Sequence, residues 1–316
     1  MGSSKKTTLR SLKAGRPPLA KSSRPSMTRK TSRALINNHH QLEKRRLQAA
    51  ARGDKVEEAL MEKEITKFGG IDHYQKASLQ GQSHDRGGDT SRVLLGWLPA
   101  PRKLLQGQTA GEASDRSSPR LRMLEVGSLS TCNACSTSGI FDVVHIDLNS
   151  QEPGIQQQDF MQRPLPRDAS ERFDIISLSL VVNFVPDAAG RGHMLRRTLD
   201  FLHEAKERGS PDNMLNTDSR SSGGDTAVDF FPSLFMVLPR SCLENSRYMT
   251  EKKFEDIMKA LGYIKLAGKI TQKLTYSLWR RELGKYDPTA KFTKKEVNPG
   301  RTRNNFAIVL NNLKGP

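Results

Sequence analysis

The segment 173–182 constrains the fold more than any other part of the chain, because it is apolar at both odd and even positions. Isoleucine, leucine and valine run through it, interrupted by one aspartate and two serines. A strand of this kind is buried on both faces, which is typical of a parallel sheet covered by helices. Shorter apolar runs at 122–126, 141–147 and 233–238 predict three further strands of the same sheet.

Helical patterns alternate with these strands, and this alternation predicts a doubly wound α/β domain over residues 120–316. The further elements expected in it, in chain order, are a helix over 188–205, a helix over 250–261 and strands over 274–279 and 305–311.

The chain before residue 120 has a different organisation. Helix formers fill 35–52, and Asp54 is expected to cap a second helix that ends at Gly69 and Gly70. The predicted divisions are a disordered basic arm over 1–34, an N-terminal helical segment over 35–106 and a linker over 107–119, with a disordered loop inside the later domain at about 206–228.

The charge is strongly positive, with 51 lysines and arginines against 34 aspartates and glutamates and a formal net charge of +17. Ten basic residues and no acidic ones fall within 1–34. That segment is rich in serine, threonine and proline and cannot bury enough apolar surface to fold. The excess favours a polyanionic partner, most simply nucleic acid. The arm is interpreted as an RNA-gripping tail or a nuclear address, with a solvated leader as the alternative.

Cysteine usage and apolar run lengths exclude other classes of protein. Three cysteines are too few for a disulfide-stapled scaffold. The longest mostly apolar run, 175–185, is too short to span a bilayer, so no membrane partner is expected. Cys132 and Cys135 have the spacing of a metal or redox pair, but only Cys242 remains as a third thiol. We therefore predict free thiols and no metal site.

Candidate ligand-binding residues follow the predicted strands, where the ligands of such sheets bind. Gly127 follows the first strand and lets the backbone approach a ligand closely. Asp147 follows the second strand, twenty residues later, where a carboxylate can accept two hydrogen bonds from a ribose diol. Asp159 can accept from an adenine amino group, and Phe160 can pack against the purine. Together these residues predict an adenosine-containing cofactor.

The glycine pattern decides which cofactor this is. A dinucleotide site needs Gly-x-Gly-x-x-Gly, whereas the next glycine after Gly127 is Gly139. S-adenosylmethionine has no phosphate and needs no such cradle, and Glu125 at the strand end can accept hydrogen bonds from its amino group. The alternative is that Gly127 and Asp147 form an ordinary turn and strand cap.

Several short segments of the chain are specific enough to indicate a family. They are Gly69-Gly70, Tyr74-Gln75-x-Ala77-Ser78, Gly81-Gln82, Arg86-Gly87-Gly88-Asp89-x-Ser91, Leu124-Glu125-Val126-Gly127, Ile146-Asp147-Leu148-Asn149 and Ser177 to Pro186. Through them the chain resembles the fungal large-subunit (25S) ribosomal RNA adenine-N1-methyltransferase family, from about Lys67 to the C-terminus without the linkers.

The resemblance implies a class I, Rossmann-like methyltransferase fold, S-adenosylmethionine as cofactor with contacts at Gly127 and Asp147, and methylation of N1 of an adenine in ribosomal RNA. It also implies a nuclear and nucleolar location and a large-subunit RNA or pre-ribosomal particle as partner. We expect a monomer.

Two other functions stay open. An animal relative that resembles this family serves as a non-catalytic S-adenosylmethionine sensor acting through a protein partner. A ribosome-assembly RNA binder with a vestigial pocket is the third hypothesis. The basic arm favours an RNA partner over a signalling partner.

The predicted site for the adenine lies just past the third strand. Asn183 offers a hydrogen-bonding group for the base edge and Phe184 an aromatic ring for its face. The alternative is that Phe184 belongs to the core and Asn183 only caps a turn. Arg191 and Arg240 are candidate phosphate contacts. The basic stretch 285–303 is a second RNA-facing patch or a solvated hairpin.

Overall fold

A computed structural model of the chain describes residues 29–70, 89–99, 120–150, 152–204 and 230–311. The linker predicted over 107–119, the loop predicted over 206–228 and residues 1–28 of the arm predicted over 1–34 fall outside these ranges. Within the described residues, no helix is both long and apolar enough to cross a membrane.

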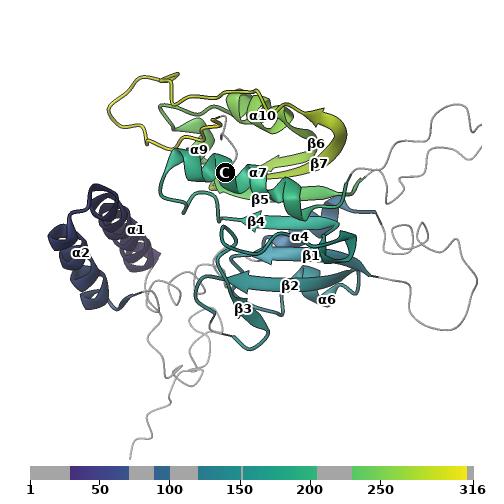
Figure 1. Cartoon of the computed structure of the whole chain (residues 1–316), viewed down its shortest axis with the longest axis horizontal. Helices are drawn as coiled ribbons and strands as arrows, with labels where there is room; N and C mark the ends of the chain where they lie inside the picture. The colour runs from purple at the N-terminus through teal and green to yellow at the C-terminus, as the bar shows by residue number, and fades with distance from the viewer. Residues whose placement is uncertain (1–28, 71–88, 100–119, 151, 205–229, 312–316) are drawn as a thin grey trace, which may run out of the picture.

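Seven strands form one sheet in the described part of the chain, in the order β3-β2-β1-β4-β5-β7-β6. The strands from β1 to β5 are parallel, whereas β7 runs antiparallel to both β5 and β6. Figure 1 shows the strands in this order, from β3 at the bottom to β6 at the top. The bounds are β1 (Leu121–Val126), β2 (Phe141–Asp147), β3 (Ile155–Gln157), β4 (Ile175–Ser179), β5 (Ser233–Pro239), β6 (Leu261–Ile270) and β7 (Leu274–Tyr286).

Helices cover both faces of the sheet, so the prediction of strands buried on two sides is confirmed. On one face, Leu124, Ile176 and Leu234 share a core with residues of α7 and α10. On the other face, Met123 and Ile175 share a core with residues of α4 and α6. The helices are α4 (Ser91–Trp97), α6 (Ala134–Thr137), α7 (Ala188–Phe201), α9 (Ser241–Glu244) and α10 (Glu251–Ala260), with a 3-10 turn η3 (Ala169–Glu171).

The predicted strand over 305–311 is wrong. Within this segment only Leu310 forms a bridge, an isolated one with Phe292. The alternating pattern that suggested a strand correctly indicates burial, because Phe306, Ile308 and Leu310 are all buried in the core. The segment lies against the start of α7, where Val309 N–H donates to the carbonyl of Ala188 at 2.9 Å.

Two strands, β3 and β6, were not predicted. β6 begins at the last turn of α10 without any intervening loop, and Gly262 makes the reversal with a φ of +81°. β3 is only three residues long, and two of them are exposed. Neither segment has the apolar pattern of a buried strand.

The N-terminal helices form a hairpin made of α1 (Arg29–Arg52) and α2 (Lys55–Lys67). The predicted break between them is confirmed, since Gly53 has a φ of +73° and the Asp54 side chain accepts from Glu57 N–H at 3.0 Å. Met61 is buried in the hairpin. α1 begins at Arg29, six residues before the predicted start and inside the segment assigned to the arm.

Candidate active site

A polar pocket opens where the strand order reverses. The chain moves outward from β1 to β3 and then returns to β4 on the other side of β1. The carboxyl ends of β1 and β4 therefore flank a switch point, the usual ligand site of doubly wound sheets. The pocket there is lined by Asp89, Thr90, Glu125, Val126, Gly127, Leu129, Ser130, Asn133 and Ser179.

Gly127 allows the turn after β1 to pass close to the loop after β4. Its φ is +73°, and a Cβ placed on it would lie 2.7 Å from Cγ2 of Val181. Its N–H donates to the carbonyl of Ile146 at 2.8 Å. Both the conformation and the contact require glycine, so the pocket floor and the loop that carries Asn183 are packed against each other.

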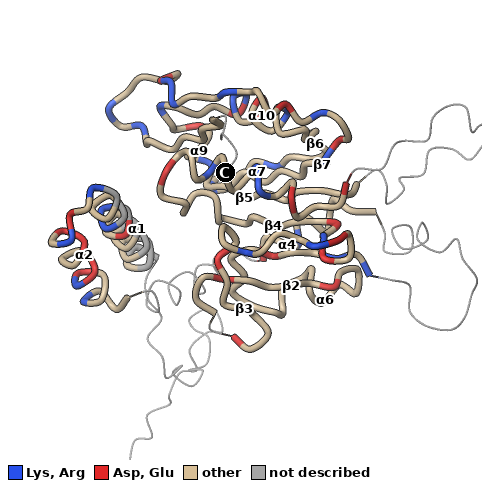
Figure 2. Tube along the Cα trace, in the orientation of Figure 1, with Lys and Arg blue, Asp and Glu red and all other residues tan. Residues whose placement is uncertain are grey.

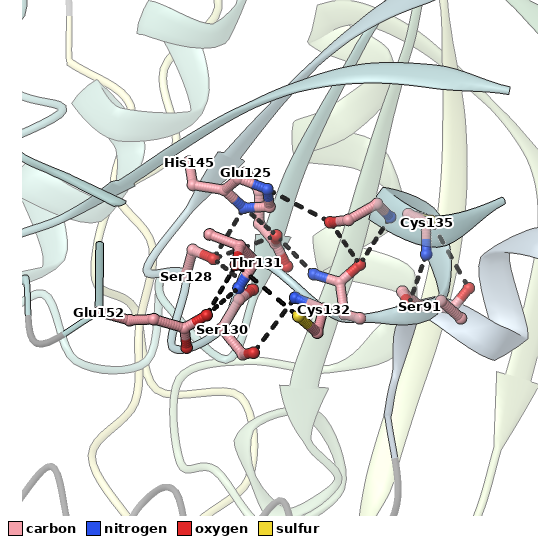
Figure 3. Close-up of polar contacts among 12 residues, drawn as sticks. Ser91, Glu125, Ser128, Ser130, Thr131, Cys132, Cys135, His145 and Glu152 are labelled. Carbon is pink, nitrogen blue, oxygen red and sulfur yellow. Dashed lines mark hydrogen bonds and ion pairs between the residues drawn. The ribbon is translucent and has the colours of Figure 1, made fainter. Parts of the chain in front are cut away.

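Glu125 is held by three donors at one oxygen. Its Oε2 receives hydrogen bonds from Asn133 Nδ2 at 2.7 Å, His145 Nδ1 at 2.9 Å and Ser128 Oγ at 3.2 Å (Figure 3). The side chain is 15% exposed and that of His145 7%. The described residues offer no hydrogen bond to Oε1, which leaves that oxygen for a ligand in the pocket that Glu125 lines.

The partners of Glu125 were not identified from the sequence. His145 lies directly across from Glu125 in the register of β1 and β2, and its Nε2 is 3.2 Å from Ser136 Oγ. The signal was present as a histidine two residues before Asp147, between the apolar residues Val144 and Ile146. Its meaning depended on the strand register, which one sequence does not reveal.

Asp89 and Thr90 are two further lining residues to which sequence reasoning assigned no role. The Asp89 carboxylate accepts from Ser91 N–H at 2.9 Å and from Ala134 N–H at 2.5 Å. Thr90 Oγ1 lies 2.9 Å from Ser179 Oγ at the end of β4. These bonds join the segment before α4 to α6 and β4, and so close one side of the pocket.

Asp147 and Asp159 lie at the neighbouring strand ends. Asp147 ends β2, and its Oδ1 accepts from Asn149 N–H at 2.8 Å while its carbonyl accepts from Gln158 N–H at 2.8 Å. The Gln158 bond brings the segment with Asp159 beside Asp147. Asp159 is half-buried, and its Oδ1 accepts from Met161 N–H at 2.8 Å.

Phe160 belongs to the hydrophobic core. Its side chain is 2% exposed, and its ring centroid lies 5.4 Å from that of Phe201 in α7. We therefore correct the prediction that the Phe160 ring packs against a purine. An apolar residue after a strand is ambiguous in sequence, because core and ligand-facing rings have the same composition.

Asn183 and Phe184 lie in a distorted loop that follows β4. Leu180 opens this loop with a φ of +59°, a conformation that leucine rarely adopts. Oδ1 of Asn183 is buried and has no hydrogen-bond partner within the described residues. The Phe184 side chain is 40% exposed. A strained backbone and an unpartnered buried acceptor both cost free energy, and such costs concentrate at functional sites.

Of the predicted site residues, only Glu125 and Gly127 line the pocket, and all the other predicted groups lie outside its lining. Cys132, Cys135 and Cys242 are free, as predicted, and burial raises the pKa of Cys135 to about 12. The prediction of a phosphate contact at Arg191 is corrected. Its guanidinium donates to the carbonyl of Ala307 at 2.8 Å and lies 4.7 Å from the Phe306 ring, so it fastens the C-terminal segment.

Five parallel strands followed by an antiparallel pair, with a polar pocket at the switch point, define a class I, Rossmann-like methyltransferase fold. The chain belongs to the family described as 25S rRNA (adenine(2142)-N(1))-methyltransferase, Bmt2, whose model matches residues 59–308.

Two yeast proteins are similar to the chain. A Saccharomyces cerevisiae protein named 25S rRNA (adenine(2142)-N(1))-methyltransferase is 35% identical over 248 residues, which are 78% of this chain and 62% of the relative. The chain thus spans less than two thirds of that relative. A Schizosaccharomyces pombe protein named 25S rRNA adenine-N(1) methyltransferase is 35% identical over 275 residues, 87% of this chain and 89% of the relative.

Solved structures are more distant. The N-methyltransferase NodS from Bradyrhizobium japonicum, in complex with S-adenosyl-L-homocysteine, has a TM-score of 0.31 and 12% identity, covering 51% of this chain and 78% of its own. The 16S rRNA methylase RmtB has a TM-score of 0.34 and 10% identity, covering 82% and 77%. At TM-scores this low, the fold assignment depends on the strand order and the family instead.

Proposed function

We propose that the chain transfers a methyl group from S-adenosylmethionine to N1 of an adenine in large-subunit ribosomal RNA. The family and both yeast relatives are named for this reaction. The observation in the structure that carries the proposal is the acceptor Oδ1 of Asn183, which is buried and unpartnered in the loop that packs on the pocket floor.

The pocket suits the charge of this cofactor. S-adenosylmethionine has an ammonium group and a positively charged sulfur but no phosphate, and the pocket is lined by the carboxylates of Asp89 and Glu125. Glu125 is the stronger candidate for the ammonium, because its Oε1 has no hydrogen bond from the described residues. Asp147 supports the ribose and Asp159 the adenine amino group, and the bond from Gln158 N–H to the Asp147 carbonyl brings their two segments together.

Methylation of N1 requires alignment more than proton transfer. The cofactor, when bound, supplies a methyl group on a positively charged sulfur, and the neutral thioether that remains is a good leaving group. Adenine N1 has its own lone pair, so no strong base is needed among the protein residues. The Asn183 amide oxygen can accept a hydrogen bond from the adenine N6 amino group and so orient N1. The exposed ring of Phe184 can stack on a base that has left its helix.

The cellular setting follows from the substrate. Large-subunit ribosomal RNA is made and modified in the nucleolus, so the pre-ribosomal particle is the proposed partner there. The chain acts as a monomer in this proposal.

The test is methyl transfer from labelled S-adenosylmethionine to ribosomal RNA by the wild type, Asn183→Ala and the control Asn305→Ala, whose side chain is exposed. Loss of the base contact misplaces N1, and a misplacement of about 1 Å costs on the order of a hundredfold in rate. Asn183→Ala should lose about that much while binding the cofactor within a few-fold of wild type, and Asn305→Ala should transfer normally. Full activity of Asn183→Ala would contradict the placement of the base, and no transfer by the wild type would contradict the enzyme.

A further inference from the structure

The loop between β7 and the C-terminal segment is exposed over most of its length but is hydrogen-bonded to the residues between α9 and α10. Val297 N–H and Asn298 N–H donate to the carbonyl of Arg247 at 2.8 and 3.0 Å, and Asn304 N–H donates to that of Asn245 at 2.9 Å. The Asn298 side chain adds a bond to the carbonyl of Ser246 at 3.1 Å. These bonds hold the loop in place against the residues between α9 and α10.

This loop and the residues beneath it carry a concentration of positive charge that we call the basic loop surface. No member forms an ion pair with an acidic side chain among the described residues. Figure 2 shows the blue segments along the outer edge of this loop. The surface consists of Arg247, Lys253, Lys291, Lys294, Lys295, Arg301 and Arg303.

Main-chain carbonyls accept from Arg247, Lys253 and Arg303, and one ring contacts Lys294, and none of these groups neutralises charge. Arg247 donates to the carbonyl of Gly300 at 2.9 Å, and Lys253 donates to that of Thr293 at 3.0 Å. Lys294 lies 4.6 Å from the centre of the Tyr248 ring. Burial and the nearby charge of Lys295 lower the pKa of Lys253. Lys253 and Lys295 are therefore close enough to repel each other, which favours an anion as a partner for this pair.

The basic loop surface is connected to the predicted base site through the C-terminal segment and α7. The segment that follows the loop packs on the start of α7, through Val309 N–H to the carbonyl of Ala188 and through the bonded Arg191 and Ala307. The loop with Asn183 comes immediately before α7. β5 also leads directly into α9, so the residues that anchor the loop lie at the carboxyl edge of the sheet, as the pocket does (Figure 1).

We propose that the basic loop surface binds the phosphate backbone of the RNA strand that carries the target adenine. This inference rests on the proposed function. Seven cations on one rigid surface suit a chain of phosphates, which contribute affinity and register without reading sequence. An acidic protein surface is the other partner with matching charge, and it is an outcome of the test below.

The test compares the full chain with the triple variant Lys291→Gln, Lys294→Gln, Lys295→Gln, which leaves the carbonyl-bonded Arg247 and Lys253 in place. The matched control is Lys55→Gln, Lys63→Gln, Lys67→Gln, three exposed lysines of α2 with the same change of net charge. Binding of a ribosomal RNA fragment is measured across salt concentrations, with methyl transfer and cofactor titration alongside.

The loop variant should raise KM for RNA about tenfold and leave kcat and cofactor affinity within twofold. Each lost phosphate contact on a single strand flattens the log–log salt slope by about 0.7, so the slope should fall by about 2. The control should keep the wild-type slope. Equal slopes for the loop variant and the wild type, or equal losses in the loop variant and the control, would overturn the proposal. An unchanged salt slope in the loop variant would instead favour an acidic protein surface as the partner of the basic loop surface. Failure of the wild type to methylate would instead count against the proposed function.

Discussion

At the scale of single residues, substitutions at two glycines distinguish the cost of backbone strain from the cost of a steric contact. Gly127 and Gly139 both have a positive φ, of +73° and +74°, but only Gly127 has a neighbour within 4 Å of an added Cβ. Gly139→Ala should cost about 1 kcal/mol of stability from strain alone. Gly127→Ala should cost more and displace Val181, which weakens cofactor binding as well. Thermal unfolding and calorimetric titration check both effects, and indistinguishable variants would contradict the close packing of the two loops.

Asp147 is the second residue that a substitution can test. Asp147→Ala removes a charged acceptor proposed for the ribose, at a cost of about 1.5–3 kcal/mol, which is roughly ten- to a hundredfold in S-adenosylmethionine affinity. Asp142→Ala, at the exposed opposite end of the same strand, is the control and should bind normally. Calorimetric titration that finds the same affinity in both variants would remove Asp147 from the site.

At the scale of elements, the sequence predicted β1, β2, β4 and β5 because their apolar pattern reports burial on two faces. The same apolar pattern gave a wrong prediction at 305–311, where the side chains are buried but the backbone forms no strand. β6 gave no such pattern, because it is partly exposed and follows α10 without a loop. In the site, Gly127 and Asn183 could be placed by counting from strand ends. His145 could not, because its role depends on the register that sets it opposite Glu125.

The packing of the C-terminal segment on α7 gives an element-scale prediction. A Cβ on Gly192 would lie 1.9 Å from the carbonyl oxygen of Val309, a main-chain atom that cannot rotate away. Gly192→Ala should therefore lower the free energy of unfolding by on the order of 1–3 kcal/mol. Gly96→Ala in α4, where an added Cβ meets nothing, is the control and should not destabilise. Denaturant unfolding measures both, and equal stabilities would contradict the close contact.

At the scale of the whole molecule, the positive charge is divided between the N-terminus and the folded part. Residues 1–28 hold seven lysines and arginines and no acidic residue. Their deletion should weaken RNA binding and flatten its salt dependence without changing cofactor affinity, because cations on the chain release phosphate counterions. RNA titrations at several salt concentrations test this. Equal salt slopes for the full and shortened chains would contradict RNA binding by residues 1–28 and favour a role as a nuclear address only.

The most direct measurement of the central claim is nucleoside analysis by mass spectrometry of ribosomal RNA incubated with the full chain and S-adenosylmethionine. The proposal predicts new N1-methyladenosine in the large-subunit RNA, and on the order of a hundredfold less when Asn183→Ala replaces the wild type for the same short time. Methyl groups on a different atom or base would contradict the assigned reaction. Cofactor binding without any methylated nucleoside would contradict the enzyme itself and favour the sensor.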